Sequence, residues 1–504
     1  MQALVFCNVL FRHIGPTMRA ELRVPNPPSE SDGHGWKAVY RNVRTRLHGI
    51  LELVDPSPYP KNRRLDAAAF AERTKDLSAD EIAERIEKLT WLANRIIEAS
   101  LRECPAEILD NWDGSIGLDA TPIRLYARPE RRARGRRGKQ LVEVHSSDPD
   151  GAWYMREHDH RDPDTQPDTG AKKGKQVAKA FWAQEATIAT ASSSDPRAKR
   201  SFPKLAVGMA SLHKPGHHPD EHGIRALASI KQRGHPSGLL AADRAYTNSK
   251  PENFQLPARA MGYRLVLDYR EDQLGIQGSH AGALQIEGGW SCPCLPEALV
   301  DATADFRAGG ITEDVWRQRL RARTAYRLRE KERPDAEGHV RLQCPAAGPA
   351  PTCRCPLKPA SVSDATAGKP LVLVTDDVAQ NPPAICRQQS VTFPPDAGAK
   401  YLQALEYESP DWRRAYPTLR NSIEGTSGTA KDGAYEALGI ADRRRIRGQA
   451  AQTLFVAFLL FGTNLRMIDS FRAQAKAEED GVMRLPRKRR RKTRPLSDHL
   501  PTTI

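Results

Sequence analysis

The chain has 504 residues, with 77 Lys and Arg against 62 Asp and Glu, so its formal net charge is 77 − 62 = +15. A positive excess of this size indicates a polyanionic partner and argues against an enzyme of neutral sugars. With 39% hydrophobic and 28% charged residues, the composition excludes a collagen, a membrane bundle and a wholly disordered protein. At about 150 residues per domain, the length suggests about three structural units.

Residues 1–110 are expected to form a helical N-terminal region that binds DNA. The stretch from Asn26 to Gly35 is rich in Pro, Ser and Gly, which predicts a loop. The segment from Ala79 to Leu92 predicts an amphipathic helix, because its apolar residues recur at helical spacing; they are Ile82, Ile86, Leu89 and Leu92.

Residues 111–274 are expected to form the first part of a catalytic core. Short apolar runs predict strands there, and a helix is expected over 221–231. Strands and helices therefore alternate as in a mixed α/β layer. The expected strands cover 116–126, 182–191, 205–212, 239–242 and 263–267.

The pattern changes twice in the second half of the chain. Residues 275–405 are rich in Pro, Gly and Cys, with a charged helix expected around 312–333, and are predicted to be an insertion with its own small fold. Residues 406–472 return to a helical pattern and are expected to complete the core. Residues 473–504 are expected to be a disordered basic tail, since 484–494 contain eight basic residues and no acid.

Two aspartates stand at chemically informative positions. Asp119 lies among apolar residues of the first expected strand, where a carboxylate is costly without a cation. Asp243 closes the run Leu239 to Ala242, so it is expected at the carboxyl end of a buried strand, where open α/β sheets bind ligands. Together they could share divalent ions that prefer oxygen ligands. The alternative is that each is a strand-end cap or a turn residue.

Glu424 comes with basic companions on an expected helix. At about 100° per residue, Arg420 lies about 40° from Glu424, and Lys431 about 20° away if the helix continues past Gly425 and Gly428. One face would then present a carboxylate between two cations suited to phosphates. The alternative is an Arg/Glu surface pair of little energetic consequence.

Taken together, Asp119 in GLDATP, Asp243 in ADRAY and Arg420-x3-Glu424-x6-Lys431 resemble the DDE-type transposases of bacterial insertion sequences. The segment 443–466 is similar to the helix that closes their catalytic domain, and the resemblance covers about 115–469. It implies a ribonuclease H-like α/β fold, a mixed sheet flanked by helices, here with a helical N-terminal region and a cysteine-containing insertion.

The resemblance also implies a two-metal phosphoryl transfer. Asp119 would bridge two Mg²⁺ ions, or Mn²⁺, with Asp243 and Glu424 each completing one site. Arg420 and Lys431 would hold phosphates, and further DNA contacts are expected from Arg244, Tyr246 and Tyr416. In the relatives the tyrosine often stands three residues before the arginine, whereas Tyr416 stands four before Arg420.

The expected function is therefore metal-dependent cleavage and strand transfer of DNA by a transposase. Its partners would be the double-stranded ends of a mobile element and target DNA, and synapsis of two ends would need at least a homodimer. Two alternatives stay open: a non-catalytic DNA-binding relative, and a metal-dependent nuclease that does not join strands.

The expected location is the bacterial cytoplasm, at the nucleoid and without a membrane partner. Eight cysteines are too few and too unevenly spread for a secreted disulfide scaffold. The first eleven residues lack the pattern of a signal peptide. The apolar run from Ala450 to Gly462 is shorter than the roughly 20 residues that span a bilayer, so we expect a buried core helix.

Six of the eight cysteines fall within the expected insertion. Their Cys-x-Cys spacing is a weaker zinc signature than Cys-x2-Cys, but clustered thiols with little apolar core around them favour a structural Zn²⁺. The alternative is that they are small core residues. The expected ligands are Cys344, Cys353, Cys355 and Cys386.

Two further polar segments are expected at the surface. The basic run 128–139 follows the first aspartate strand and predicts a loop that contacts the DNA backbone, with a mobile solvated loop as the alternative. Four histidines in a loop rich in Pro and Gly are expected to be exposed rather than to bind metal; they are His213, His217, His218 and His222.

Overall fold

The computed structural model describes residues 31–57, 59–134, 141–156, 179–193 and 202–481, together with positions 17, 28 and 29. The chain divides into two compact units. The first comprises residues 1–89, 127–150 and 446–454, and the second comprises 90–126, 151–445 and 455–504. The expected insertion, 275–405, belongs to the same unit as the sheet that precedes it.

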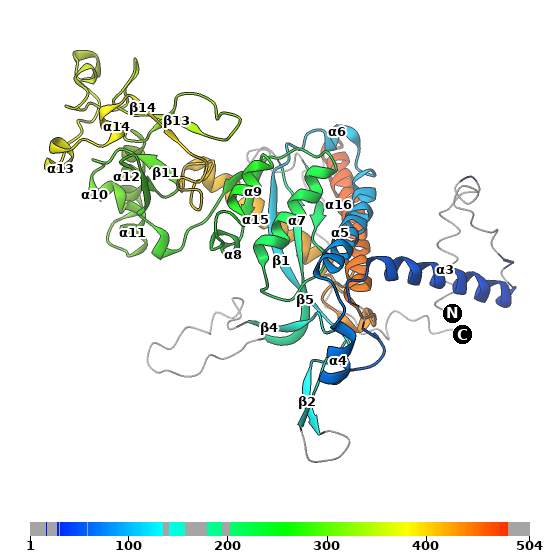
Figure 1. The fold of residues 1–504 in the computed structure, drawn as a ribbon. Coiled ribbons are helices and arrows are strands. Elements are labelled where there is room, and N and C mark those ends of the chain that lie inside the picture. Colours follow the sequence, from blue (N-terminus) through cyan, green and yellow to red (C-terminus); the bar gives the residue numbers. More distant parts are fainter. Residues whose placement is uncertain are drawn as a thin grey trace. The chain divides into compact units, whose positions relative to one another are not determined.

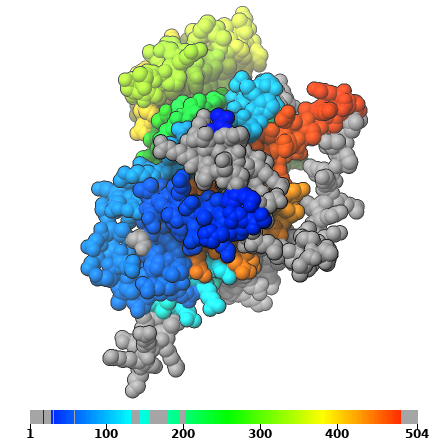
Figure 2. Space-filling view, turned by 90° about the vertical axis from the view of Figure 1, so that its right-hand side faces the viewer, coloured from blue at the N-terminus to red at the C-terminus, as the bar shows by residue number. Residues whose placement is uncertain are grey.

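The described part of the first unit is mainly helical. Asp32 caps α3 (Gly33–Val54) by accepting a hydrogen bond from the Gly35 N–H at 2.8 Å, so residues 33–35 form a helical turn and the loop expected over 26–35 is wrong there. The surface of this helix, coloured dark blue, is seen in Figure 2. The helices are α3 (Gly33–Val54), α4 (Ala67–Thr74) and the beginning of α5 (Ala79–Leu101).

The first unit also contains a hairpin. Strand β2 (Arg131–Arg134) pairs antiparallel with β3 (Leu141–Val144). The expectation of a loop over 128–139 is therefore wrong for residues 131–134, whose backbone pairs with β3. Residues 135–139 lie outside the described part of the chain.

A mixed sheet organises the second unit (Figure 1). Its strand order is β4-β5-β1-β7-β8, with β6 pairing on β5. Strands β1 and β5 are antiparallel, whereas β7 is parallel to both β1 and β8. Helices flank the sheet, so the predicted mixed α/β class is confirmed. The strands are β1 (Ile116–Arg124), β4 (Ala152–Arg156), β5 (Lys179–Ala191), β6 (Ala206–Met209), β7 (Leu239–Ala242) and β8 (Arg264–Val266).

Two long helices cover opposite faces of this sheet. A Cβ added to Gly117 of β1 would meet helix α15 (Pro410–Ala430). The next residue, Leu118, instead contacts Gly223 of helix α7 (Pro219–Gln232). Because successive side chains of a strand point to opposite faces, α15 and α7 lie on different sides of β1. The shorter helices here are α6 (Ala106–Leu109), α8 (Arg244–Thr247) and α9 (Gln255–Ala260).

Strand β6 is short, and two asparagines satisfy its outer backbone groups. Asn94 of α5 bonds both the N–H and the C=O of Met209, at 2.9 and 2.7 Å. Asn464 bonds both groups of Ala206, each at 2.8 Å. Such edge coverage removes the unpaired ladder that would otherwise invite pairing with another chain.

Asn464 belongs to α16 (Gln449–Glu479). By length and composition alone this helix could cross a membrane. Its residues Val456, Ala457 and Leu460 are fully buried, as the expected core helix requires. The helix starts after position 443, so the start of the expected closing segment is wrong, and it runs through 473–479, which were assigned to the tail. Residues 482–504, with the basic run, lie outside the described part of the chain.

Residues 275–405 form two small three-stranded sheets with short helices. The charged helix α12 (Glu313–Thr324) ends before 333, because Arg329 and Glu330 enter a strand. One sheet has the order β11-β10-β9 and the other β12-β13-β14. The strands are β9 (Ile276–His280), β10 (Ala283–Ile286), β11 (Gly289–Ser291), β12 (Arg329–Glu330), β13 (Val340–Gln343) and β14 (Ser390–Phe393). The remaining helices are α10 (Glu297–Val300), α11 (Ala302–Arg307), α13 (Asp376–Gln380) and α14 (Ala384–Arg387).

Candidate active site

Asp119 and Asp243 lie on adjacent parallel strands. Leu118 of β1 is in register with Ala242 of β7, so the two aspartates are the next residues along their strands. Neighbouring strands are about 5 Å apart, which sets the spacing of the two backbones here. Asp119 shares a strand face with Gly117, two residues earlier, and that is the face covered by α15.

Helix α15 is fixed at its start and pressed against β1. The Ser409 hydroxyl caps it by accepting the Trp412 N–H at 3.1 Å, and Pro410 occupies its first position. A Cβ on Gly117 would approach the Leu419 carbonyl oxygen to 2.4 Å, so only glycine allows the observed packing. Gly425 and Gly428 do not end the helix, which continues to Ala430.

Arg420 links two of the three candidate carboxylates. Its Nη1 lies 3.1 Å from Asp243 Oδ1, and its Nε lies 4.0 Å from Glu424 Oε1. The Glu424 side chain is 63% exposed and that of Asp243 is 39% exposed. The helix therefore brings Glu424 to the sheet edge where the two aspartates lie, with one guanidinium among the acids.

Lys431, the C-cap of α15, reaches the same strand. Its Nζ donates to the Thr121 hydroxyl, and Thr121 stands two residues beyond Asp119 on the same face of β1. The expected pair of cations flanking Glu424 along one helix is thus present. The two glycines had left the position of Lys431 uncertain. The helix continues past them to Ala430, so Lys431 follows as its C-cap.

The electrostatics of Asp119 differ from those of an ordinary surface acid. Burial raises the pKa of Asp119 to about 6, and the negative charge of Asp243 acts in the same direction. The Ala120 N–H, at 2.8 Å, and the charges of Arg420 and Lys431 oppose that shift in pKa. A carboxylate that is desolvated beside a second carboxylate is stabilised by a cation, and oxygen donors of this kind suit Mg²⁺ or Mn²⁺.

The expected DNA contacts divide into accessible and buried ones. Arg244 is half exposed and pairs with Asp268 at 2.7 Å, so its guanidinium is at the surface. Tyr246 is 1% exposed and packs on Phe254. It is therefore a core residue, and the expected DNA contact at this position is wrong. Tyr416 is also buried and stacks on Trp412, so its ring packs the helix onto the core.

Asp268 is a charged residue that the sequence interpretation missed. It lies two residues beyond the end of β8, and Asp243 directly follows β7, so both lie beyond the carboxyl ends of neighbouring parallel strands. Asp268 accepts hydrogen bonds from Arg244 and, at 2.8 Å, from the Tyr407 hydroxyl. The signal was available, because Asp268 directly follows the apolar run expected over 263–267.

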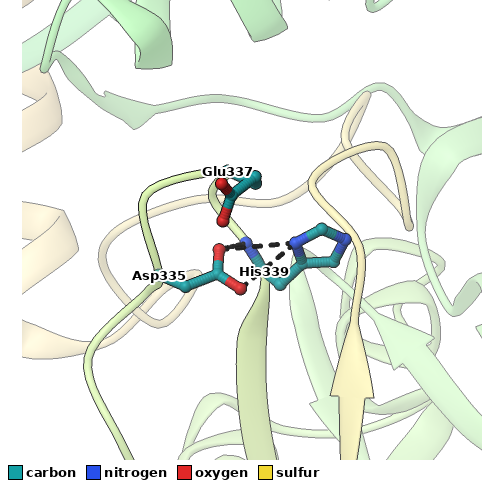
Figure 3. A group of neighbouring side chains, drawn as sticks. All are labelled: Asp335, Glu337 and His339. Carbon is teal, nitrogen blue, oxygen red and sulfur yellow. Dashed lines mark hydrogen bonds and ion pairs between the residues drawn. The ribbon is translucent and has the colours of Figure 1, made fainter.

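One group of side chains already has its ligand atoms close enough together for a metal ion. Among the described residues, Asp335, Glu337 and His339 alone form a set of three His, Cys, Asp or Glu whose ligand atoms all lie within 4.8 Å of one another (Figure 3). All three come from the turn before β13, and both acids are exposed. The His339 N–H donates to Asp335 at 2.8 Å, which accounts for the arrangement without an ion.

The histidine cluster differs from the expected exposed loop. His213 is buried, and its ring stacks on that of His222 with centroids 3.7 Å apart. His222 belongs to α7, whereas His217 and His218 are exposed. Four of the six insertion cysteines were expected to bind zinc, and all six are buried in one apolar cluster of that region.

Comparison with known proteins adds no relative. No protein-family model, curated protein or solved structure matches this chain. What the chain does must therefore be argued from its own residues.

Proposed function

We propose that this chain is a DDE-type transposase that cleaves DNA and transfers the cut strand in a metal-dependent reaction. The observation that carries the proposal is the meeting of Asp119, Asp243 and Glu424 from three separate elements at one edge of the sheet. These are the residues that the motif resemblance names, and they are up to 305 positions apart, 424 − 119, in the chain.

The strand order supports the finer fold that the resemblance implies. Strand β1 is central, with an antiparallel neighbour on one side and two parallel strands on the other. This mixed order, with the acids on the central strand and on its parallel neighbour, is the arrangement expected of a ribonuclease H-like core.

The three carboxylates offer the oxygen donors that divalent ions prefer, although their ligand atoms do not all lie within 4.8 Å of one another. Asp119 would be shared between two ions, with Asp243 and Glu424 each completing one set of oxygen ligands. When bound, such ions supply activation of the attacking oxygen and charge neutralisation at the leaving oxygen. The raised pKa of Asp119 gives a chemical reason for the fit, because a cation there offsets the desolvation that raises the pKa.

The basic residues would bind and orient the substrate. Arg420 can exchange its contact with Asp243 for a bidentate contact with a phosphate, once ions compensate the acid. Lys431 is suited to act as a point charge for a second phosphate. Arg244 is at the surface beside Asp243 and adds a third cation for the DNA backbone.

The partners follow from the chemistry. The substrate would be double-stranded DNA, both as element ends and as target, and the net charge of +15 suits that polyanion. Joining two ends requires two active sites, so a homodimer is proposed for the synaptic complex. We place the protein in a bacterial cytoplasm, at the nucleoid.

Strand-joining assays separate this function from its two alternatives. Duplexes copied from the DNA that flanks the coding region, pre-cut to carry a free 3′-hydroxyl, are incubated with target DNA and Mg²⁺. Joined products support a transposase. Hydrolysis without joining identifies a metal-dependent nuclease, and binding without either reaction identifies a non-catalytic DNA-binding protein.

A further inference from the structure

The cysteines of residues 275–405 gather around one small cavity. It has a volume of about 10 Å³, close to that of a single water-sized sphere, and is lined by five thiols together with apolar side chains and Lys358. Water in such a space would lack the two to four polar partners that it requires. The thiols are Cys292, Cys344, Cys353, Cys355 and Cys386.

Three of these cysteines are presented by turns of identical construction. Cys292, Cys344 and Cys355 are each followed by proline. In each turn the N–H three residues later donates to the cysteine carbonyl, from Leu295 at 3.1 Å, Ala347 at 2.9 Å and Lys358 at 2.9 Å. Proline at the second position favours such a turn and leaves the following N–H free to face the sulfur.

The following N–H group acts on the thiol in each turn. The pKa of all three thiols is raised, by the Cys294 side chain and burial for Cys292 and by burial for Cys344 and Cys355. The backbone N–H groups of Cys294, Ala346 and Leu357 respectively oppose that rise in pKa. Backbone N–H groups directed at sulfur stabilise a thiolate, the form that binds metals. The packing of a thiol in an apolar core does not by itself require three turns of the same construction.

Cys386 provides a fourth thiol on a different element. It lies in α14 and lines the same cavity as Cys344 and Cys355. Four sulfur donors from four separate segments can form the tetrahedral set that Zn²⁺ prefers. The four sulfurs stand further apart here than they would around a bound zinc ion. Zn–S bonds of about 2.3 Å place tetrahedral sulfurs about 3.8 Å apart.

We propose that Cys292, Cys344, Cys355 and Cys386 bind one structural Zn²⁺ that fixes residues 275–405. The proposed ligand set differs from the expected one in that Cys292 takes the place of Cys353. Cys353 lines the cavity, but it belongs to no Cys-Pro turn. The small apolar core here includes Trp290, Tyr326 and Phe393, and small folds of this kind are commonly stabilised by a metal.

This site is independent of the proposed function, because it shares no residue with the candidate active site. The first test is elemental analysis of the full-length protein, purified without added metal or chelator. We expect one zinc ion per chain. Iron in its place, or an absence of metal with all cluster thiols reactive after denaturation, overturns the proposal.

Cobalt substitution tests the ligand type without any mutation. After zinc removal under reducing conditions, Co²⁺ alone should give the intense visible bands of a tetrahedral ion and a sulfur-to-cobalt charge-transfer band. Added Zn²⁺ should abolish both. Weak absorption typical of hexacoordinate cobalt would refute a thiolate set.

Single alanine variants test the ligand assignment. Cys344→Ala and Cys386→Ala should lose most of their zinc, whereas Cys353→Ala should keep it. Cys104→Ala is a matched control, because Cys104 is a buried thiol of the other core cluster. Should a ligand variant not fold, the wild-type zinc content and cobalt spectrum still decide the proposal. Zinc lost from Cys353→Ala and kept in Cys386→Ala refutes the proposed ligand set.

Discussion

Burial of the Asp119 carboxylate costs free energy, but the same carboxylate is suited to bind a metal ion. Its carboxylate is largely buried beside Asp243, and burial raises its pKa to about 6. At neutral pH the group is ionised in spite of that burial. The Ala120 N–H, Arg420 and Lys431 stabilise this charge only in part, so a bound cation would stabilise it further, as expected of a residue with a role in metal binding.

The substitution Asp119→Asn is predicted to stabilise the metal-free protein. A carboxyl group whose folded pKa exceeds its unfolded value of about 3.9 loses its stabilising contribution as the pH rises from about 4 to about 6. In EDTA at pH 7 the variant should therefore unfold with a free energy about 1–3 kcal/mol higher than the wild type. Denaturant titrations at pH 7 and pH 4 measure this difference, which should vanish at pH 4.

Added Mg²⁺ provides the control for that experiment. It should raise the melting temperature of the wild type but not of Asp119→Asn, because only the wild type offers the shared ligand. A variant that is less stable than the wild type in EDTA at pH 7 shows that the buried charge is already compensated.

His213, which is buried, and His222, which is partly buried, form a second titratable pair. Burial lowers the pKa of His213 to about 4 and that of His222 to about 3. A histidine whose folded pKa lies below its unfolded value of about 6.5 reduces stability as the pH falls through that interval, because the unfolded chain binds the proton more tightly.

The substitution His222→Gln should therefore flatten the dependence of unfolding free energy on pH. Between pH 6.5 and pH 5 the wild type should lose about 2 kcal/mol more than the variant. The comparison must be between variants, because Asp119 and Asp148, whose pKa values are both raised to about 6, act in the opposite direction. Equal slopes for the two proteins would show that His222 is solvated in the native state.

At the scale of elements, helix α15 carries the third proposed metal ligand, Glu424, and both cations proposed to bind phosphates, Arg420 and Lys431. Its position depends on Gly117, where the helix backbone touches the strand. The structure thus links a glycine in β1 to the placement of Glu424, although the two residues are far apart in the sequence.

The substitution Gly117→Ala should displace α15 and abolish activity. The new Cβ would lie 2.4 Å from the Leu419 carbonyl oxygen, a backbone atom that cannot move alone. Overpacking of this kind costs about 1–3 kcal/mol. Metal-dependent DNA cleavage and thermal unfolding measure the two effects.

Gly425→Ala is the matched control on α15 itself. Its Cβ would meet only the flexible end of Lys204, at 3.8 Å, and alanine favours a helix by about 1 kcal/mol over glycine. This variant should be active and slightly more stable. Full activity of Gly117→Ala would show that α15 is not held by that contact.

The elements show how far the sequence alone could be interpreted. The run Leu239 to Ala242 is apolar throughout, so its strand and the position of Asp243 at its end follow directly. The spacing of Arg420, Glu424 and Lys431 was interpretable because the helical repeat fixes their angles. The register between β1 and β7 could not be predicted, because strand pairing depends on contacts distant in sequence.

Burial is the other property that local pattern left undetermined. Tyr246 follows the candidate aspartate in the chain, yet it turns into the core on the short helix α8. The sequence shows the three Cys-Pro dipeptides, but their convergence on one cavity depends on the fold of residues 275–405. Local chemistry was thus easier to predict than its spatial grouping.

For the whole molecule, the excess of positive charge is concentrated in segments outside the mixed sheet of the second unit. The run 484–494 contains eight basic residues and no acid, and 128–139 is also strongly basic. Charge of this distribution suits non-specific attachment to DNA, while the proposed chemistry depends on three acids.

Removal of residues 484–504 should weaken DNA binding without abolishing catalysis. For each phosphate that the truncated chain no longer neutralises, the slope of log K against log salt should become shallower by about 0.9. Binding isotherms over a range of salt concentrations measure that slope for the truncated and the full-length chain. Identical slopes would show that the basic run does not engage DNA.

The central claim is that Asp119, Asp243 and Glu424 act as one metal-binding set, and strand joining by Glu424→Gln tests it most directly. Asp411→Asn is the control, because Asp411 lies on the same helix and is 67% exposed, compared with 63% for Glu424. With Mg²⁺ and pre-cut ends, Asp411→Asn should join strands as the wild type does. Glu424→Gln should bind the same DNA and join none; joining at the wild-type rate by Glu424→Gln would contradict the account.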